Sequence, residues 1–288
     1  MTATLYAWFN GELIASPLES ASVASNAEFL LNRSNTFGDG VFETLLVSNS
    51  KVQLLNLHMQ RLSIGLKRLG IDCSAELIQA DIDNALTHLP EKSTNHVLKL
   101  VVSRGSSVFG YGGENLSINR LTLLKPYQPS NHSSSQLMVC TTRLGLQPAF
   151  AGIKHCNRLE QVLAKKEVEL QGCDDGLMLD QSGLVIETTS ANIFILEAGQ
   201  LITPPIIDCG VAGVVRQHII EHADFIVREE AISLERLFNS DGVMLTNSVQ
   251  GLKLVHKCQK KDGSIHSWPQ SDKLTALQQA INSSLHER

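Results

Sequence analysis

The segment IKHCNRLEQVLAKKE, residues 153–167, joins a helix pattern to a lysine that the helix does not need. Asn157 could cap the helix, and Glu160, three residues later, would complete a capping box. Gly172 follows as a stop signal. Apolar side chains between these signals recur at helical spacing and are expected to form one buried face: Leu159, Val162, Leu163 and Leu170. Lys154 precedes the cap by three residues, so the helix does not explain its presence.

Lys154 is expected at the edge of the core, because it lies beside Ile153 and close to the apolar helix face. A lysine that loses hydration has a lowered pKa. Only the neutral amine attacks a carbonyl, so such a place suits a Schiff-base lysine. The ordinary alternative is a solvated surface lysine, which is the common fate of this residue type.

Length and composition indicate a soluble globular protein of two domains. The chain has 288 residues, of which 43% are hydrophobic and 18% charged. A net charge of -5 gives no electrostatic reason to expect nucleic acid or an anionic membrane as partner. The chain has no apolar run of the ~18 residues that span a bilayer, and its start does not have the pattern of a signal peptide. We therefore expect a cytoplasmic protein.

The six cysteines are scattered along the chain and have no zinc-site spacing. We expect reduced thiols and no metal site.

The first half of the chain predicts an α/β domain over residues 1–127. Asn10-Gly11 between short apolar runs predicts a β-hairpin. The remaining elements are expected to be a turn and strand at 37–47, helices at 54–70 and 74–89, and strands at 96–105 and 120–127. The polar segment QPSNHSSSQ, residues 128–136, is then the clearest linker in the chain.

The second half predicts another α/β domain over residues 137–288, which contains Lys154. It begins with a strand at 137–144, and a hairpin is expected after the Lys154 helix, where GLMLD and GLVIETTSANIFIL are separated by Gln-Ser. A glycine-opened helix at 210–224 and a strand within 241–255 follow. The expected fold class is α/β, with two domains that each contain a sheet and helices.

The glycines of GVAGVVRQHII suggest an anion site, because Gly210 and Gly213 directly precede a helix. The first N–H groups of a helix are unpaired and attract phosphate. Ser248 could add a hydroxyl and Arg61 a fixed positive charge. The alternative is an ordinary glycine loop, and the segment has neither the Walker nor the dinucleotide pattern.

Glu187 ends the apolar strand GLVIE and could face a ring nitrogen. A pyridine nitrogen opposite a carboxylate stays protonated and can draw electrons from a carbanion. Neighbouring polar side chains could hold the carboxylate in place: Thr188, Thr189, Ser190 and Asn192. A strand-end carboxylate in water is the ordinary alternative. An aldehyde, a phosphate and a pyridine nitrogen together point to pyridoxal phosphate as the cofactor.

The chain resembles a known family, the branched-chain-aminotransferase-like (fold type IV) pyridoxal-phosphate enzymes. The motifs that carry the resemblance are FGDGVFET (37–44), LHMQRL (57–62), IKHCNRLEQVLAK (153–165), ETTSANIF (187–194) and GVAGVVRQ (210–217). The pattern K-H-x-N-R-L-E-Q in the third motif is similar to the aminodeoxychorismate lyase branch. That branch releases 4-aminobenzoate and pyruvate for folate biosynthesis. A transaminase of D- or branched-chain amino acids on the same scaffold is the alternative.

The resemblance implies roles for particular residues. It implies that Lys154 binds the cofactor covalently and then moves protons, and that Glu187 faces the pyridinium nitrogen. Arg61 would bind the phosphate, together with the backbone at Val214 and Val215 and the hydroxyl of Ser248. The family works as a homodimer on a small-molecule substrate, with the active site between the two domains and partly closed by the neighbouring subunit.

One loop departs from the family pattern. Members often have an arginine there, in G-G-R-G-Y, whereas this chain reads SSVFGYGG (106–113), with Phe109 at that place. If that arginine holds a substrate carboxylate, another group must replace it here. The nearby candidates are Arg104, Tyr111, His155 and Arg158, and the sequence does not distinguish among them. The stretch LNRSNTFGDG, at the entry to the first motif, is also unusual beside the D-R-G-F form that is common in the family.

Overall fold

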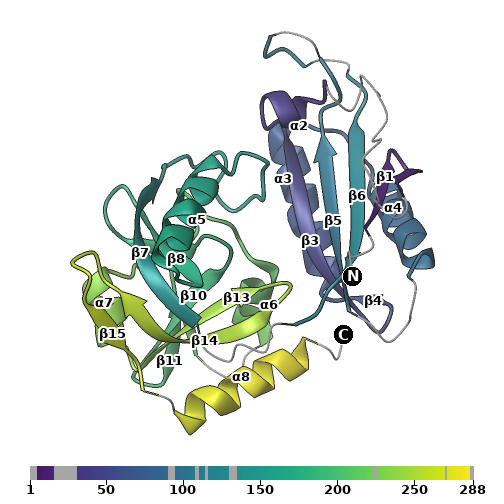
Figure 1. The fold of residues 1–288 in the computed structure, drawn as a ribbon. Coiled ribbons are helices and arrows are strands. Elements are labelled where there is room, and N and C mark those ends of the chain that lie inside the picture. Colours follow the sequence, from purple (N-terminus) through teal and green to yellow (C-terminus); the bar gives the residue numbers. More distant parts are fainter. Residues whose placement is uncertain are drawn as a thin grey trace. The chain divides into compact units, whose positions relative to one another are not determined.

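The computed structural model describes residues 5–15, 31–89, 95–107, 110–113, 116–129, 135–222, 226–269 and 271–285 (Figure 1). The chain divides into two compact units. Unit 1 comprises Met1–Pro129 and Ile153–Asn157, and unit 2 comprises Ser130–Gly152 and Arg158–Arg288. The division between Pro129 and Ser130 falls inside the segment expected to be a linker, of which residues 130–134 lie outside the described part.

The placement of Lys154 differs from the expected domain assignment. We expected Lys154 in the second domain, whereas its segment, Ile153–Asn157, makes its contacts in unit 1. The physical reason is strand pairing, because this segment forms backbone hydrogen bonds with a strand of unit 1.

The described part of unit 1 contains a six-stranded antiparallel sheet. Its strands, in spatial order, are β2 (Glu12–Ala15), β1 (Tyr6–Phe9), β6 (Asn119–Pro126), β5 (His96–Ser103), β3 (Gly40–Ser48) and β4 (Lys51–Val52). Asn10 and Gly11 join β1 to β2 with φ angles of 52° and 89°, the left-handed values that a tight hairpin turn requires. The hairpin and the strands expected in this half are therefore confirmed.

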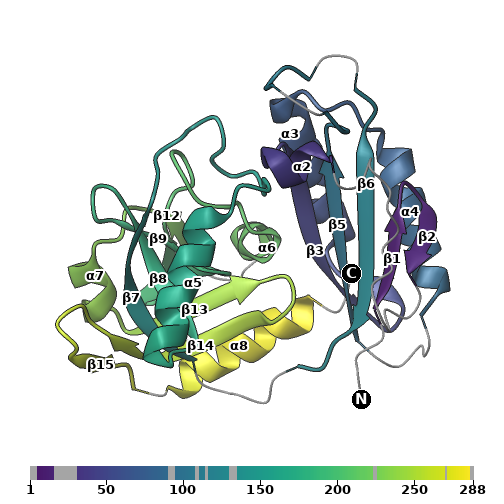
Figure 2. The same cartoon turned by 45° about the horizontal axis from the view of Figure 1, so that its top comes forward.

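Two helices pack with this sheet around a single core (Figures 1 and 2). The core combines alternate residues of β3, such as Val41 and Leu45, with Leu62 and Leu66 of α3 (Leu55–Leu69). The second helix, α4 (Ala75–Thr87), packs against β6, and the side chain of Ser74 caps it by accepting a hydrogen bond from the N–H of Leu77. Both helices were predicted from their apolar spacing. A short helix, α2 (Arg33–Thr36), precedes β3.

Unit 2 contains a sheet that closes into a barrel (Figure 2). The strands are β7 (Ser135–Leu144), β8 (Asp175–Asp180), β9 (Val185–Thr188), β10 (Asn192–Glu197), β11 (Gln200–Thr203), β12 (Val227–Glu229), β13 (Gly242–Asn247), β14 (Gly251–Gln259) and β15 (Ile265–Ser267). The order β10-β13-β14-β7-β8-β9 closes because β9 also pairs with β10. Alternate apolar residues of these strands, such as Leu177, Ile193 and Val243, form the barrel core.

Four helices belong to unit 2 in its described part: α5 (Leu159–Gln171), α6 (Val214–His222), α7 (Leu234–Asn239) and α8 (Asp272–Ser284). As Figure 1 shows, α5 lies along β7 and β8, and α8 along β14. No described helix is both long and apolar enough to cross a membrane. The six cysteines all lie in the described part, and none forms a disulfide.

Helix α5 exists as predicted, but its predicted buried face was wrong. The exposed fractions of Leu159, Val162, Leu163 and Leu170 are 70%, 61%, 49% and 76%. The small side chains of Ala164 and Val168 face β7 and β8 instead and are fully buried. A bulky residue could not replace them there, because the strands come so close that a Cβ on Gly176 would lie 2.6 Å from Val168.

The predicted cap of α5 was also wrong. Arg158 occupies the N-cap position, and no side chain caps the helix. The side chain of Asn157 instead donates to the carbonyl of Gly38, and Glu160 accepts the N–H of Gly145. Both side chains therefore hold loops rather than the start of the helix.

Candidate functional site

The Lys154 segment is attached to the edge of β3. The N–H of Phe42 donates to the carbonyl of Lys154 at 2.8 Å, and the N–H of Cys156 donates to the carbonyl of Gly40 at 2.9 Å. Between these bonds, Val41 and His155 form an antiparallel bridge. The backbone around Lys154 is thus held as a short strand rather than as a free loop.

The side chain of Lys154 lies over an aromatic ring. Its Nζ is 4.6 Å from the centre of the Phe42 ring, and Lys154 is half-buried. The preceding residue, Ile153, is only 1% exposed. A lysine between a buried neighbour and a ring face has part of its hydration replaced by apolar contact. This is the environment that the sequence predicted for Lys154, at the edge of a core.

A close turn holds the other end of the segment. Gly38 has a φ of 67°, and a Cβ at this position would lie 2.3 Å from Oδ1 of Asn157. Only glycine fits there, because both the backbone angle and the contact exclude a larger residue. The FGDG sequence therefore lets Asn157 bind the turn that precedes β3.

Arg61 forms an ion pair with the buried carboxylate of Glu43, the residue of β3 that follows Phe42. Its Nε donates to Oε1 of Glu43 at 2.8 Å, and its Nη2 donates to Oε2 at 2.5 Å. His58 lies one helical turn before Arg61, and its Nδ1 is 2.7 Å from Oε2 of the same carboxylate. The side chains of Glu43 and His58 are each only 1% exposed.

The protonation states within this cluster follow from burial and charge. Burial raises the pKa of Glu43, but the charge and hydrogen bonds of Arg61, with help from His58, outweigh this effect and bring the pKa to about 2. Burial lowers the pKa of His58, and this effect outweighs the hydrogen bond with Glu43 that opposes it. At neutral pH Glu43 is charged and His58 is neutral, so Nδ1 of His58 carries the proton that it donates to Glu43.

In unit 2, Glu187 lies on β9 and is 4% exposed. The N–H of Val211 donates to its Oε2 at 2.9 Å, and the side-chain amide of Gln161 lies 3.5 Å from Oε1. Asn192, directly across from Glu187 on β10, donates to the carbonyl of Val211 at 2.8 Å. The loop at Val211 is therefore held from both sides, and it supplies a backbone donor to the carboxylate.

The hydroxyl groups that follow Glu187 hold a different carboxylate, which corrects the predicted support of Glu187. Thr188 and Ser190 donate to Oδ2 of Asp175 at 2.7 and 3.0 Å, and Thr189 donates to Oδ1 through both its hydroxyl and its N–H. Asp175 starts the neighbouring strand β8 and is 8% exposed. The TTS sequence thus forms a turn on Asp175, and of the four predicted supports only Asn192 acts near Glu187.

The start of α6 is closely packed against Asn192. A Cβ on Gly213 would lie 1.9 Å from Oδ1 of Asn192, so any side chain immediately before the helix would require Asn192 to move. The side chains of Val214 and Val215 are buried, at 3% and 2% exposed. These two residues can therefore offer a ligand their backbone N–H groups, as the sequence predicted for an anion site.

A buried hydroxyl lies on the same side of the barrel as the start of α6. Asn192 and Thr246 are directly opposite in the pair of β10 and β13, so their side chains share one face of the sheet. Thr246 is 1% exposed, and its Oγ1 has no hydrogen-bond partner among the described residues. Ser248 follows in the turn after β13. The unpaired hydroxyl and the glycine-lined helix start fit an anionic group such as phosphate.

Arg104, a candidate for substrate binding, has its guanidinium engaged by the protein. Its Nε donates to Asp39 at 2.9 Å and its Nη1 to the carbonyl of Gly70 at 2.9 Å, while its Nη2 donates to the carbonyl of Leu69. These contacts favour a structural role for Arg104, because they use three sides of the guanidinium group.

The other substrate candidates have different environments. Tyr111 is 87% exposed, with its ring 5.4 Å from that of Phe37. Buried Arg33 donates to the carbonyl of Tyr111 at 2.8 Å and so holds this part of the loop. His155 is half-buried in the Lys154 segment. Phe109 lies outside the described residues.

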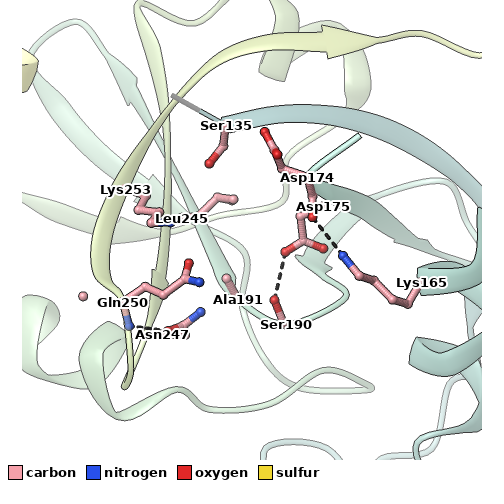
Figure 3. A pocket seen from close by; sticks show the side chains of 11 residues that line it. Ser135, Lys165, Asp174, Asp175, Ser190, Ala191, Leu245, Asn247, Gln250 and Lys253 are labelled. Carbon is pink, nitrogen blue, oxygen red and sulfur yellow. Dashed lines mark hydrogen bonds between the residues drawn. The ribbon is translucent and has the colours of Figure 1, made fainter. Parts of the chain in front are cut away.

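A separate polar cavity of about 240 Å³ lies in unit 2. Figure 3 shows Asp175 and Ser190 on one side of it, with Asn247 and Lys253 on strands β13 and β14. None of the predicted cofactor residues is among the described residues that line it. This cavity shares the Asp175 turn with the Glu187 region but is not the predicted cofactor site.

Comparison with known proteins agrees with this arrangement. The family model for amino-transferase class IV matches residues 40–258. The chain is 33% identical over 232 residues to an aminodeoxychorismate lyase of Vibrio harveyi, covering 78% of this chain and 84% of that protein. It is 30% identical over 219 residues to a putative branched-chain-amino-acid aminotransferase of Methanocaldococcus jannaschii, covering 74% of this chain and 76% of that protein.

A solved structure gives the same result. The crystal structure of 4-amino-4-deoxychorismate lyase from Pseudomonas aeruginosa superposes with a TM-score of 0.80 at 31% identity, covering 98% of both chains. The family match includes the strand that binds the Lys154 segment, Glu187 and the start of α6. The chain therefore belongs to the amino-transferase class IV family.

Proposed function

We propose that this chain is a pyridoxal-phosphate-dependent aminodeoxychorismate lyase, which converts 4-amino-4-deoxychorismate to 4-aminobenzoate and pyruvate for folate biosynthesis. Similarity to the lyases of Vibrio harveyi and Pseudomonas aeruginosa supports this activity, at 33% and 31% identity. The observation that carries the proposal is Lys154, held on the edge of β3 with its amine over the Phe42 ring.

Six residues are proposed to hold the cofactor. Lys154 would bind the aldehyde, and Arg61 would bind the phosphate. Glu187 would keep the ring nitrogen protonated, and the N–H groups of Val214 and Val215 with the hydroxyl of Ser248 would complete the phosphate site. When bound, pyridoxal phosphate supplies an aldehyde that captures the substrate amine and a ring that accepts electrons.

Lys154 then acts as the general base. Its neutral amine would remove the proton at C4 of the substrate, and Glu187 would hold the ring nitrogen in its protonated form. Loss of this proton, followed by departure of the enolpyruvyl oxygen from C3, makes the carbocycle aromatic. The departing enolpyruvate takes up a proton at its methylene carbon and becomes pyruvate. No water or redox partner is consumed.

Replacing the lysine tests the proposal directly. Lys154→Ala should abolish release of 4-aminobenzoate and pyruvate while the chain stays folded, because both cofactor capture and proton removal use this amine. Lys99→Ala is a matched control, since Nζ of Lys99 also lies over the Phe42 ring, at 5.1 Å from its centre. The control should keep near-normal activity. Borohydride reduction should leave a pyridoxyl group on Lys154, and labelling of any other lysine would refute the assignment.

A transaminase of D- or branched-chain amino acids is the second candidate. Similarity of 30% identity to the putative branched-chain-amino-acid aminotransferase of Methanocaldococcus jannaschii favours it. The two activities share the cofactor residues but differ in the second substrate. Incubation with D-alanine or L-leucine and 2-oxoglutarate should give little glutamate compared with lyase turnover. A glutamate rate above the lyase rate would identify the chain as a transaminase.

The chain is also proposed to work as a homodimer, as its family resemblance implies, and in the cytoplasm, as its scattered cysteines suggest. Supporting the dimer, α5 presents the apolar side chains of Leu159, Val162 and Leu170 to solvent in the isolated chain, with exposed fractions of 70%, 61% and 76%. Light scattering during size-exclusion chromatography should give twice the chain mass. A single-chain mass at micromolar concentration would exclude the dimer.

A further inference from the structure

The ion pair with Glu43 fixes the orientation of the Arg61 guanidinium. Binding of a phosphate by an arginine does not by itself require such a fixed orientation. Two nitrogens of the guanidinium donate to the two oxygens of the carboxylate, at 2.8 and 2.5 Å. Such a two-point contact fixes the plane of the guanidinium as well as its position. The side chains of Arg61 and Glu43 are 10% and 1% exposed, so water has little access to either group.

His58 gives the carboxylate a second fixed contact. Its Nδ1 lies 2.7 Å from Oε2 of Glu43, and its ring is 1% exposed. Because His58 and Arg61 are three residues apart on α3, they lie on the same face of the helix and reach one carboxylate on β3. The orientation of Arg61 is therefore set by two elements of unit 1, α3 and β3.

We propose that Glu43, supported by His58, is a positioning residue that orients the Arg61 guanidinium for the phosphate of the cofactor. This inference rests on the proposed function, in which Arg61 binds that phosphate. The side of the guanidinium formed by Nε and Nη2 is bound to Glu43, which fixes the direction in which the group points. Without Glu43, a long and flexible arginine would have to be ordered by the ligand itself, at the cost of affinity.

Comparing two ligands separates this role from a general role in folding. Pyridoxal phosphate and pyridoxal share the aldehyde and the ring, and only the first has a phosphate. The full chain, freed of cofactor, is titrated with each ligand, and binding is followed by absorbance. The wild-type chain should bind pyridoxal phosphate more tightly. Glu43→Gln should lower this preference about tenfold to 100-fold, because a charge-assisted contact to the phosphate is lost.

A second variant covers the case in which Glu43→Gln does not fold. Glu43→Asp keeps the negative charge but is one methylene shorter, so it cannot reach both guanidinium nitrogens from the same backbone position. It should lower the preference for the phosphate ligand by a smaller factor than Glu43→Gln.

The matched control is another buried arginine–carboxylate pair of unit 1. Arg120 donates to Asp81 through Nε at 2.6 Å and Nη2 at 3.4 Å, and the two side chains are 13% and 6% exposed. Asp81→Asn should destabilise the chain but leave the preference for pyridoxal phosphate over pyridoxal as in the wild type.

The outcomes are distinct. If the preference of both Glu43 variants equals that of the wild type, or if Asp81→Asn lowers it equally, Glu43 is not a positioning residue. If the wild-type chain binds neither ligand, the proposed function itself fails.

Discussion

Two buried carboxylates, one in each unit, show how differently a negative charge can be held. Glu43 in unit 1 is 1% exposed, is bound at two points by the Arg61 guanidinium and has a pKa of about 2. Glu187 in unit 2 is 4% exposed, and the contacts that hold it include the N–H of Val211 and the amide of Gln161, which are neutral groups.

We propose that Glu43 is a structural charge and that Glu187 is a functional one. A buried charge that is fully paired contributes to the fold and to the orientation of its partner. Glu187 accepts a backbone N–H from Val211, and a buried carboxylate attracts a cation such as a protonated ring nitrogen. We therefore expect substitutions of Glu43 to affect mainly stability, and substitutions of Glu187 to affect mainly catalysis.

Glu43→Gln should cause the largest loss of stability. It leaves the Arg61 charge buried without its partner, and breaking a buried ion pair in this way costs about 3–5 kcal/mol. Urea unfolding should show a lower midpoint with an unchanged slope. A loss below about 1 kcal/mol would contradict the assignment of Glu43 as a structural charge.

Glu187→Gln should have the opposite effect, with a small change in stability and a large loss of turnover. Its amide oxygen can still accept the N–H of Val211, so the free energy of unfolding should change by less than about 1 kcal/mol. Turnover should fall about 100-fold, as expected when one electrostatic contact with a developing charge is removed. Steady-state release of 4-aminobenzoate, measured at saturating cofactor, tests this prediction. Undiminished turnover would remove Glu187 from its proposed role.

Strong local patterns allowed much of the fold to be predicted from the sequence. The hairpin at Asn10-Gly11 depends on two residues that adopt positive φ easily, and α3 depends on apolar spacing over 15 residues. Glu43 lies within the family motif FGDGVFET, but the motif alone does not predict its role. The signal was present, because a carboxylate at an inward position of the apolar strand VFETLLV needs a buried partner, and His58 and Arg61 are spaced to provide it.

Features that depend on the approach of distant segments could not be predicted in the same way. The apolar spacing of α5 is compatible with more than one buried face, and the strands β7 and β8 select the one with Ala164 and Val168. The hydroxyls of Thr188 and Ser190 are adjacent in sequence to Glu187, yet they bind Asp175. Hydrogen-bond partners across a barrel follow from strand register, which local sequence does not specify.

Asp175→Asn in unit 2 should lower the free energy of unfolding by an amount between those of Glu43→Gln and Glu187→Gln. Asp175 accepts from the side chains of Thr188, Thr189 and Ser190, and an amide cannot accept from all of them. The loss in free energy of unfolding should be about 1–3 kcal/mol. Asp174→Asn is the control, since Asp174 is exposed and accepts the N–H of Gln136. Equal effects of the two variants would show that the turn does not depend on Asp175.

His58 should produce the smallest effect, a decline in stability on the acid side of neutrality. Its pKa in the folded chain lies below the ordinary value of 6.5, mainly because of burial. As the pH falls below about 6.5, the unfolded chain takes up the proton first, so the contribution of His58 is complete above that pH and is lost below it. The slope from this single group is at most about 1.4 kcal/mol per pH unit.

The effect of His58 can be separated from that of Glu43 by pH. Glu43 adds its own loss of stability only at lower pH, between 4.5 and about 2. His58→Gln should therefore flatten the profile of unfolding free energy between pH 6.5 and 5, as measured by urea unfolding at each pH. Parallel profiles of His58→Gln and the wild type would mean that folding does not lower the pKa of His58.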